Sequence, residues 1–442
     1  MASVVLAGGA FITGIAIYFG ASDFQIAMLA AIPSLTQVIQ IVAAFIIDTT
    51  GWRKGITIYS LLISRLLLFG IAFLAFFKGN WSLSLLLILY LLNYISLMSG
   101  AAGAISWFAD LVPARIRGRF FASRNTAIAL STVLAVIFGG FLLDKFRSAG
   151  SEEYGYFALF SLAGILGLVS IVLLRKLPNV IIQKIDENLN FEYFFEPLRD
   201  KSFLKILIVF VSWNFALGIS APFFNPHMLT NLRMSFTLVS LYSAGGAIMA
   251  VIFNRPWGKI IDRFGCKPVA IVTAFAISLI PFVWFFPRHD FLSVLIFESI
   301  YSGIFWAGFN ISAFNIPIAY SPVKKRTKYI AIFSVMSGLA LFLGSITAGL
   351  LSQEWSNVRI PWGKQTIVNY HLIFALSGTL RFLSAFFMLS FQEPHEKQTP
   401  EVLQYIGHSM VRWFSQGRQV FDIFLKRLDI FNNDDDEFGN KP

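Results

Sequence analysis

Within a mostly apolar chain, Glu298 is the residue whose type and setting point most directly to chemistry. It is the one carboxylate, among 24 Asp and Glu residues, that falls inside a long apolar stretch. An ionised carboxylate is costly in hydrocarbon, so Glu298 should face a cavity, pair with a cation or carry a proton. Two interpretations stay open: a proton-coupling group, or a neutral, hydrogen-bonded side chain that holds helices together.

Two apolar stretches carry polar or small residues at helical spacing. The residues are Asn214, Gly218, Ala221 and Asn225 in and just after 203–222, and Ser299, Ser302, Trp306 and Asn310 in 291–318. Such stripes let helices approach closely. They also suit an aqueous cavity with amide groups and a tryptophan as a stacking surface, which we favour. The substrate-binding candidates are therefore Trp213, Asn214, Asn225, Ser302, Trp306 and Asn310.

Two cations, Arg65 and Arg381, also fall inside apolar stretches. For both we favour structural pairing with helix ends, or snorkelling of the charged group towards water. Glu298 and Arg381 differ in expected depth by roughly 10 Å at the helical rise. The sequence therefore predicts that they form no simple ion pair.

The composition predicts what surrounds these residues. Of 442 residues, 56% are apolar, 48 are Phe and only 13% are charged, about half the charged share of a soluble domain. No aqueous core of one chain hides that much hydrocarbon, so the expected solvent is lipid. The net charge of +11 would suit nucleic acid in a soluble protein. The positions of the charges indicate otherwise, and we expect no nucleic-acid partner.

Several kinds of site are not supported by the sequence. The single cysteine, Cys266, excludes a disulfide framework, and five scattered histidines argue against a metal cluster. The pattern Gly-x-x-x-x-Gly-Lys-Ser/Thr of a nucleotide-binding loop does not occur. We therefore expect no metal, no cofactor and no enzymatic activity.

The apolar stretches are long enough to cross a bilayer, which needs roughly 20 residues per helix. They predict twelve spans, at 2–20, 24–47, 55–77, 82–107, 125–143, 155–174, 203–222, 236–253, 268–287, 291–318, 329–351 and 366–391. Positively charged residues mark the cytoplasmic loops of membrane proteins. The segments that follow the even-numbered spans hold 26 of the 35 Lys and Arg. The segments that follow the odd-numbered spans hold 7. Both termini are therefore predicted to be cytoplasmic, in the cell inner (plasma) membrane.

Two loops repeat in matching order. Asp48, Gly51 and Arg53 follow the second span, and Asp262, Gly265 and Lys267 follow the eighth. Each loop places a carboxylate at a helix end, then a glycine that permits a tight turn, then a cation. A second pair of basic loops, at 111–120 and 320–329, lies 209 residues apart. The sequence therefore predicts a duplicated six-helix unit.

At these loops the sequence resembles the major facilitator superfamily. That family's signature is Gly, three residues, Asp, Arg, one residue, Gly, then basic residues. The second half matches it at Gly258, Asp262, Arg263, Gly265 and Lys267, whereas Ala44, Thr49 and Trp52 depart from it in the first half. The chain also resembles a bacterial-type subgroup with a Trp-Asn pair in the seventh helix, here Trp213 and Asn214.

The resemblance implies alternating access, with two six-helix halves rocking about a central site. It also implies that helices 1, 4, 7 and 10 line the cavity. The motif would lock a cytoplasmic gate, a role that falls on Asp48, Gly51, Arg53, Gly258, Asp262, Arg263, Gly265 and Lys267. The alternative is that these loops provide only turns and charges that set the topology.

We expect an all-α integral membrane fold of twelve transmembrane helices in two pseudo-symmetric halves. The halves are 1–174 and 203–391, joined by a cytoplasmic linker at 175–202 with an amphipathic segment. Residues 392–442 are predicted to form an amphipathic and acidic tail on the cytoplasmic side.

The predicted function is secondary active transport of a small, neutral or weakly charged organic solute, with proton coupling through Glu298 as an open question. The alternative is a non-transporting receptor or assembly factor on the same scaffold. The expected partners are the small-molecule substrate and membrane lipid, and we expect a monomer.

Overall fold

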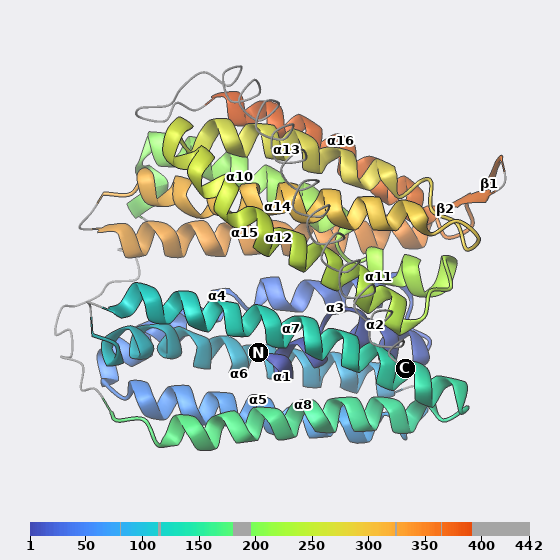
Figure 1. Cartoon of the computed structure of the whole chain (residues 1–442), viewed down its shortest axis with the longest axis horizontal. Helices are drawn as coiled ribbons and strands as arrows, with labels where there is room; N and C mark the ends of the chain where they lie inside the picture. Colours follow the sequence, from blue (N-terminus) through green and yellow to red (C-terminus); the bar gives the residue numbers. More distant parts are fainter. Residues whose placement is uncertain (80, 114–115, 180–195, 323–324, 364, 391–442) are drawn as a thin grey trace, which may run out of the picture.

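The computed structural model describes residues 1–79, 81–113, 116–179, 196–322, 325–363 and 365–390 (Figure 1). The side chain of Asp48 lies outside this description, as do those of Arg117 and Arg119. The predicted amphipathic part of the linker and the predicted tail also fall outside the described residues, so both stay predictions.

The described chain is almost entirely helical, and its first group of helices occupies the lower part of Figure 1. We call this group the N-terminal half. It comprises α1 (Ala2–Leu6), α2 (Gly9–Tyr18), α3 (Asp23–Leu35), α4 (Val38–Thr50), α5 (Arg53–Leu74), α6 (Ser82–Leu111), α7 (Arg117–Ser148) and α8 (Glu152–Arg175).

The second group, the C-terminal half, lies above the first in Figure 1. It begins with η2 (Glu196–Arg199), α10 (Lys201–Ser220), α11 (Phe224–Pro226) and η3 (His227–Asn231). It continues with α12 (Phe236–Phe264), α13 (Cys266–Val283), α14 (Ser293–Ala319), α15 (Arg326–Glu354), α16 (Asn369–Phe387) and η5 (Met388–Ser390).

Within the described residues, eleven helical stretches are long and apolar enough to cross a membrane, and Ala2–Tyr18 is a shorter apolar stretch. These twelve segments correspond to the twelve predicted spans. Many of their large apolar side chains are exposed, such as Leu134 and Phe314 at 68%. Water does not favour so much exposed hydrocarbon on long helices, but lipid does. The molecule is therefore an all-helical membrane protein.

The second predicted span is interrupted in the structure. Pro33 lies near the end of α3, and proline lacks the N–H that would continue the helical hydrogen bonds. Thr36 then donates its hydroxyl to the Ile32 carbonyl at 3.0 Å, and α4 starts two residues later. The interruption divides one membrane crossing into two helical segments.

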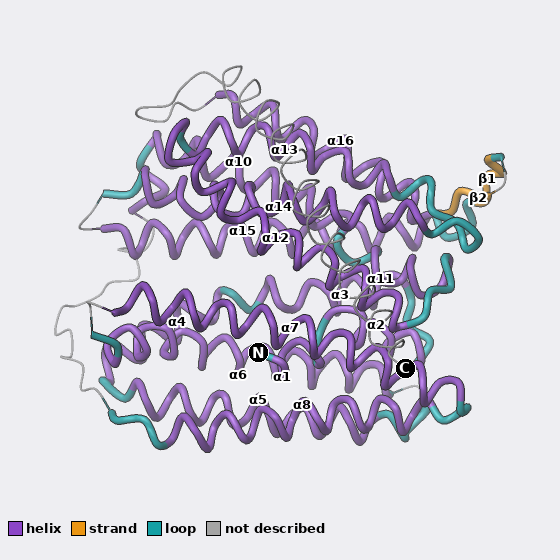
Figure 2. The backbone as a smooth tube through the Cα atoms, in the orientation of Figure 1, coloured by secondary structure: helices purple, strands orange, loops and turns teal. Residues whose placement is uncertain are grey.

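Strands β1 (Arg359–Trp362) and β2 (Gln365–Val368) form an antiparallel hairpin between α15 and α16, which the sequence analysis did not predict (Figure 2). We call this end of the molecule the hairpin face. The opposite end, which carries the turns at Gly51 and Gly265, is the motif face. Gly51 has φ 70° and Gly265 has φ 95°, the conformation that we expected of turn glycines.

The two halves pack together towards the hairpin face, and in Figure 1 they diverge towards the motif face. On α15, a Cβ on Gly349 would lie 2.7 Å from Ala27 of α3. On α7, a Cβ on Gly140 would lie 2.6 Å from the Phe236 carbonyl oxygen of α12. Small residues therefore permit both of these helix contacts between the halves.

Close packing also occurs within the C-terminal half, where α10 crosses α15. A Cβ on Gly218 would lie 2.3 Å from the backbone oxygen of Leu341, which cannot rotate away. By contrast, a Cβ on Gly258 of α12 would meet nothing within 4 Å. At Gly218, the helix-packing interpretation of the polar stripe therefore has a direct structural basis.

These two glycines provide a matched test of the crossing. We expect Gly218→Ala to destabilise the protein by about 1–3 kcal/mol, because the helices must separate. Gly258→Ala should leave stability unchanged or raise it, because alanine is the better helix former. Thermal unfolding of both variants in detergent, followed by tryptophan fluorescence, measures the difference. Equal melting temperatures for the two variants would show that α10 and α15 do not pack this closely.

Candidate functional site

A cavity of about 390 Å³ lies within the C-terminal half, and we call it the C-half cavity. Residues of α10 to α16 line it, so the described walls come from this half alone. Its polar and aromatic wall residues include Asn225, Tyr242, Trp284, Glu298, Trp306 and Arg381. The cavity therefore combines apolar surface with a few polar groups, as small-molecule sites do.

Glu298 lies on α14 and is only 1% exposed. The hydroxyl of Tyr242, on α12, donates to its Oε2 at 2.5 Å. Ser299 donates its hydroxyl to the backbone oxygen of Tyr242 at 2.7 Å. These two hydrogen bonds join α12 to α14 and fix the position of the carboxyl group on the cavity wall.

Arg381 lies on α16 and is 3% exposed. Its Nη2 donates to Ser220 Oγ at 2.5 Å, and Ser377 donates to the same hydroxyl oxygen at 3.0 Å. Its Nε has no hydrogen-bond partner within the described part of the chain. The guanidinium is therefore buried with its hydrogen-bonding capacity only partly used.

Glu298 and Arg381 are the two charged residues among the described residues of the cavity wall. As the sequence predicted, no direct ion pair joins them within the described structure. They nevertheless line one cavity, which the estimate of their depths did not suggest. Burying two opposite charges without direct contact is costly. The cavity wall therefore carries an acidic and a basic group at separate positions.

The structure brings only some of the predicted substrate-binding residues together. Asn225, Ser302 and Trp306 line the C-half cavity with Glu298. Trp213 is fully buried and packs against Phe309 at 4.8 Å between ring centroids. A substrate contact by any of these residues stays a prediction.

The two other predicted asparagines also lie away from this wall. Asn214 is half-buried and donates to the Phe210 carbonyl of its own helix at 2.8 Å. Asn310 is exposed on α14. A second cavity, of about 280 Å³, shares Tyr242, Ser302 and Trp306 with the first.

Sequence reasoning missed Tyr242 and Trp284, and for Arg381 it favoured structural pairing with helix ends or snorkelling. Tyr242 lies on α12, which showed no polar stripe that directed attention to it. The link between Arg381 and the cavity depends on how α16 packs against α10, through Ser377 and Ser220. A single sequence carries no signal for that packing.

At the motif face, Arg53 forms an ion pair with Asp110 at 2.6 Å and is 3% exposed. This contact lies within the N-terminal half, between the start of α5 and the end of α6. In the other half, Asp262 and Arg263 are exposed and Lys267 is buried. The gate role predicted for these residues and for Gly51, Gly258, Gly265 and Asp48 stays a prediction.

The end of the linker is fixed to α15 by charge. Glu196 of η2 accepts hydrogen bonds from Lys325 and Lys328. The two ammonium groups hold the pKa of the Glu196 carboxyl below its ordinary value. This contact connects the segment before α10 to the motif-face end of α15.

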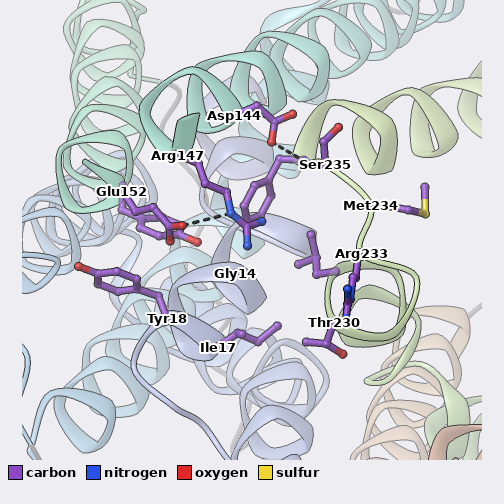
Figure 3. Close-up of a pocket in the computed structure, with 13 residues that line it drawn as sticks. Gly14, Ile17, Tyr18, Asp144, Arg147, Glu152, Thr230, Arg233, Met234 and Ser235 are labelled. Carbon is purple, nitrogen blue, oxygen red and sulfur yellow. Dashed lines mark hydrogen bonds and ion pairs between the residues drawn. The ribbon is translucent and has the colours of Figure 1, made fainter. Parts of the chain in front are cut away.

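At the hairpin face, Asp144 of α7 accepts hydrogen bonds from the first backbone N–H groups of α12. Phe236 donates at 2.8 Å to one carboxylate oxygen and Thr237 at 2.7 Å to the other. Figure 3 shows Asp144 beside the start of α12, with Arg147 reaching towards Glu152. A carboxylate at a helix N-terminus satisfies free N–H groups and complements the helix dipole.

Asp23 makes a second connection between the halves. It accepts hydrogen bonds from Tyr370 at 2.6 Å, from Asn369 at 2.7 Å and from Ser352 at 2.8 Å. We call Asp23, Asp144 and their partners the hairpin-face seal. The sequence analysis singled out neither carboxylate, because their partners are distant in the chain.

Comparison with known proteins agrees with this architecture. The family model of the Major Facilitator Superfamily matches residues 1–225 and 206–425. Comparison of the sequence with curated proteins gives no match.

Several solved structures are similar in fold, at low sequence identity. A mutant of the nucleoside transporter NupG is 15% identical, with a TM-score of 0.66 and coverage of 88% of this chain and 96% of that one. A bacterial homologue of the human lysosomal transporter Spinster is 13% identical, with a TM-score of 0.65 and coverage of 88% and 95%. The xylose transporter XylE from E. coli is 14% identical, with a TM-score of 0.64 and coverage of 91% and 97%.

At these identities the structural likeness establishes the fold, whereas the family model covers nearly the whole chain. This chain therefore belongs to the Major Facilitator Superfamily, and it is a multi-pass secondary transporter rather than an enzyme.

Proposed function

We propose that this transporter carries a small organic solute, neutral or weakly charged overall, and that the solute binds in the C-half cavity. The observation that supports this most is the pair of buried charges, Glu298 and Arg381, on one cavity wall. Ionisable groups inside a membrane bundle are expensive and mark substrate or ion pathways. A cavity of about 390 Å³ is large enough for a small organic molecule.

We also propose that the motif face is cytoplasmic and the hairpin face external, because positive charge concentrates in the motif-face segments. In that orientation, the inner (plasma) membrane carries the protein with both termini inside. The hairpin-face seal then closes the outer side, so the arrangement described here is inward-open. Alternating access requires the seal to break so that the cavity opens to the other side.

The residues of the seal support this proposal. Asp144 and Asp23 connect the halves through hydrogen bonds that a rocking motion could break and re-form. The described residues that line the C-half cavity all come from one half. Its exposure therefore depends on how the other half is placed.

The rival function, a non-transporting receptor or assembly factor, depended on partner binding by the tail. That tail lies outside the described residues, whereas the cavity and the seal lie within them. The cavity and the match to the transporter family support transport.

Removal of the Asp144 charge should open the seal. In Asp144→Asn the amide cannot accept from both N–H groups of α12, and loss of such a helix cap costs about 1 kcal/mol. A reporter cysteine at Ser240, which is 1% exposed beside Gly140, should react roughly fivefold faster with a maleimide. The experiment uses Cys266→Ser protein in detergent, where both faces meet the reagent.

Asp290→Asn is the control, because Asp290 is an exposed aspartate on the same face whose one ion pair within the described chain is with Arg288, at 3.5 Å. It should leave the reaction rate of the reporter unchanged. If Asp144→Asn also leaves that rate unchanged, Asp144 does not hold the halves together.

Glu298 is proposed as the coupling residue for protons. A solute is first identified by the rise in melting temperature that it causes in the purified protein. In liposomes, we expect Glu298→Gln to abolish the part of its uptake that depends on an imposed pH difference. Glu354→Gln changes an exposed glutamate at the end of α15 and should behave as the unsubstituted protein. Unchanged gradient-driven uptake in Glu298→Gln would exclude coupling through this residue.

A further inference from the structure

We propose that the substrate of the C-half cavity is a zwitterion with an apolar or aromatic body. Its carboxylate would bind Arg381 and its ammonium group would bind Glu298. This inference rests on the proposed transport function and names the substrate class for the same site.

Arg381 is suited to bind a carboxylate. A guanidinium offers five N–H donors in a planar fork that matches a carboxylate. Within the described residues, Nη2 donates to Ser220 at 2.5 Å and Nε has no hydrogen-bond partner. A buried arginine with unused donors is costly unless an anion, such as a ligand carboxylate, completes its hydrogen bonds.

Glu298 is suited to bind an ammonium group. Tyr242 donates a hydrogen bond to its carboxylate, and a carboxylate can accept about four, so acceptor capacity remains for a ligand. An ammonium group brings three donors and the opposite charge. A proton and an ammonium group would compete for this carboxylate, which agrees with the coupling proposed above.

The charge balance of the wall selects for a molecule that carries both charges. Glu298 and Arg381 are the charged residues among the described lining residues, so their formal charges cancel. A cation or an anion alone would match one of them and leave the other buried without a partner. A neutral polyol could hydrogen-bond to both groups but would bring neither counter-charge. A zwitterion matches both at once and is neutral overall.

The remaining wall residues indicate the chemical character of the uncharged part of the substrate. Phe224, Met228 and Leu341 give apolar surface, and Trp284 and Trp306 give flat aromatic surface. Such walls gain from burying a hydrocarbon or aromatic group. The substrate class is therefore an amino acid or short peptide with a large apolar side chain.

The test compares molecules of similar shape that differ in charge. L-Phenylalanine and glycyl-L-phenylalanine carry both charges, phenethylamine carries only the cation, 3-phenylpropionate only the anion, and 2-phenylethanol neither. Melting temperatures of the purified, full-length protein are measured with each compound over a range of concentrations. We expect at least one zwitterion to bind about tenfold or more tightly than every single-charge or neutral compound.

The variants should change the preference in opposite directions. In Arg381→Gln, phenethylamine should bind as well as the zwitterion, because the carboxylate has lost its partner. In Glu298→Gln, 3-phenylpropionate should bind as well as the zwitterion. Arg359→Gln and Glu354→Gln change exposed residues and should keep the original preference. A variant that merely folds poorly would lose all binding and could not produce this reciprocal pattern.

The inference is overturned if neither zwitterion binds more tightly than the single-charge and neutral compounds. It is also overturned if the two variants show the same preference as the unsubstituted protein. In either case the proposed transport function still stands when another solute is carried. Failure of transport itself would appear instead as a cavity that is never reached from the two sides of the membrane.

Discussion

The candidate site depends above all on two buried ionisable side chains of opposite type, which line one cavity without a direct ion pair between them in the described structure. Glu298 and Arg381 are 1% and 3% exposed, and each is held by hydroxyl groups rather than by the other charge. Keeping two ions out of water costs several kcal/mol unless hydrogen bonds and counter-charges offset it. A packed, purely structural core would gain from apolar residues here. The two side chains therefore support our proposal of a binding site whose hydrogen bonds are complete only when a solute is bound.

We propose that the hairpin-face seal lets the protein alternate between a closed and an open arrangement on this side. Asp144 and Asp23 each bind groups that would face water if the halves separated, so opening exchanges protein hydrogen bonds for hydrogen bonds to water. The net contribution of such an exchange is small, about 0.5–1.5 kcal/mol for each bond. The closed and open arrangements can therefore lie close in free energy, and a bound solute can shift the balance between them.

Much of the fold could be predicted from the sequence, because long apolar stretches and turn glycines are local signals. The spans and the turns at Gly51 and Gly265 belong to this class. Glu298 was found because a lone carboxylate in an apolar stretch is conspicuous. Arg381, Tyr242 and the seal carboxylates were not assigned to these sites, because their partners lie 56 to 347 residues away. Trp213 was proposed as a stacking surface, and the sequence alone could not show that its ring packs against Phe309.

The central claim, that the C-half cavity opens to each side of the membrane in turn, is tested most directly by a single cysteine in its wall. Asn225 lines the cavity and is half-buried, so Asn225→Cys in Cys266→Ser protein reports its accessibility. The label is a membrane-impermeant maleimide, applied to right-side-out and to inverted vesicles. The account predicts labelling from the motif face, and additional labelling from the hairpin face when Asp144→Asn opens the seal. A cysteine that reacts from neither face in both proteins would contradict it.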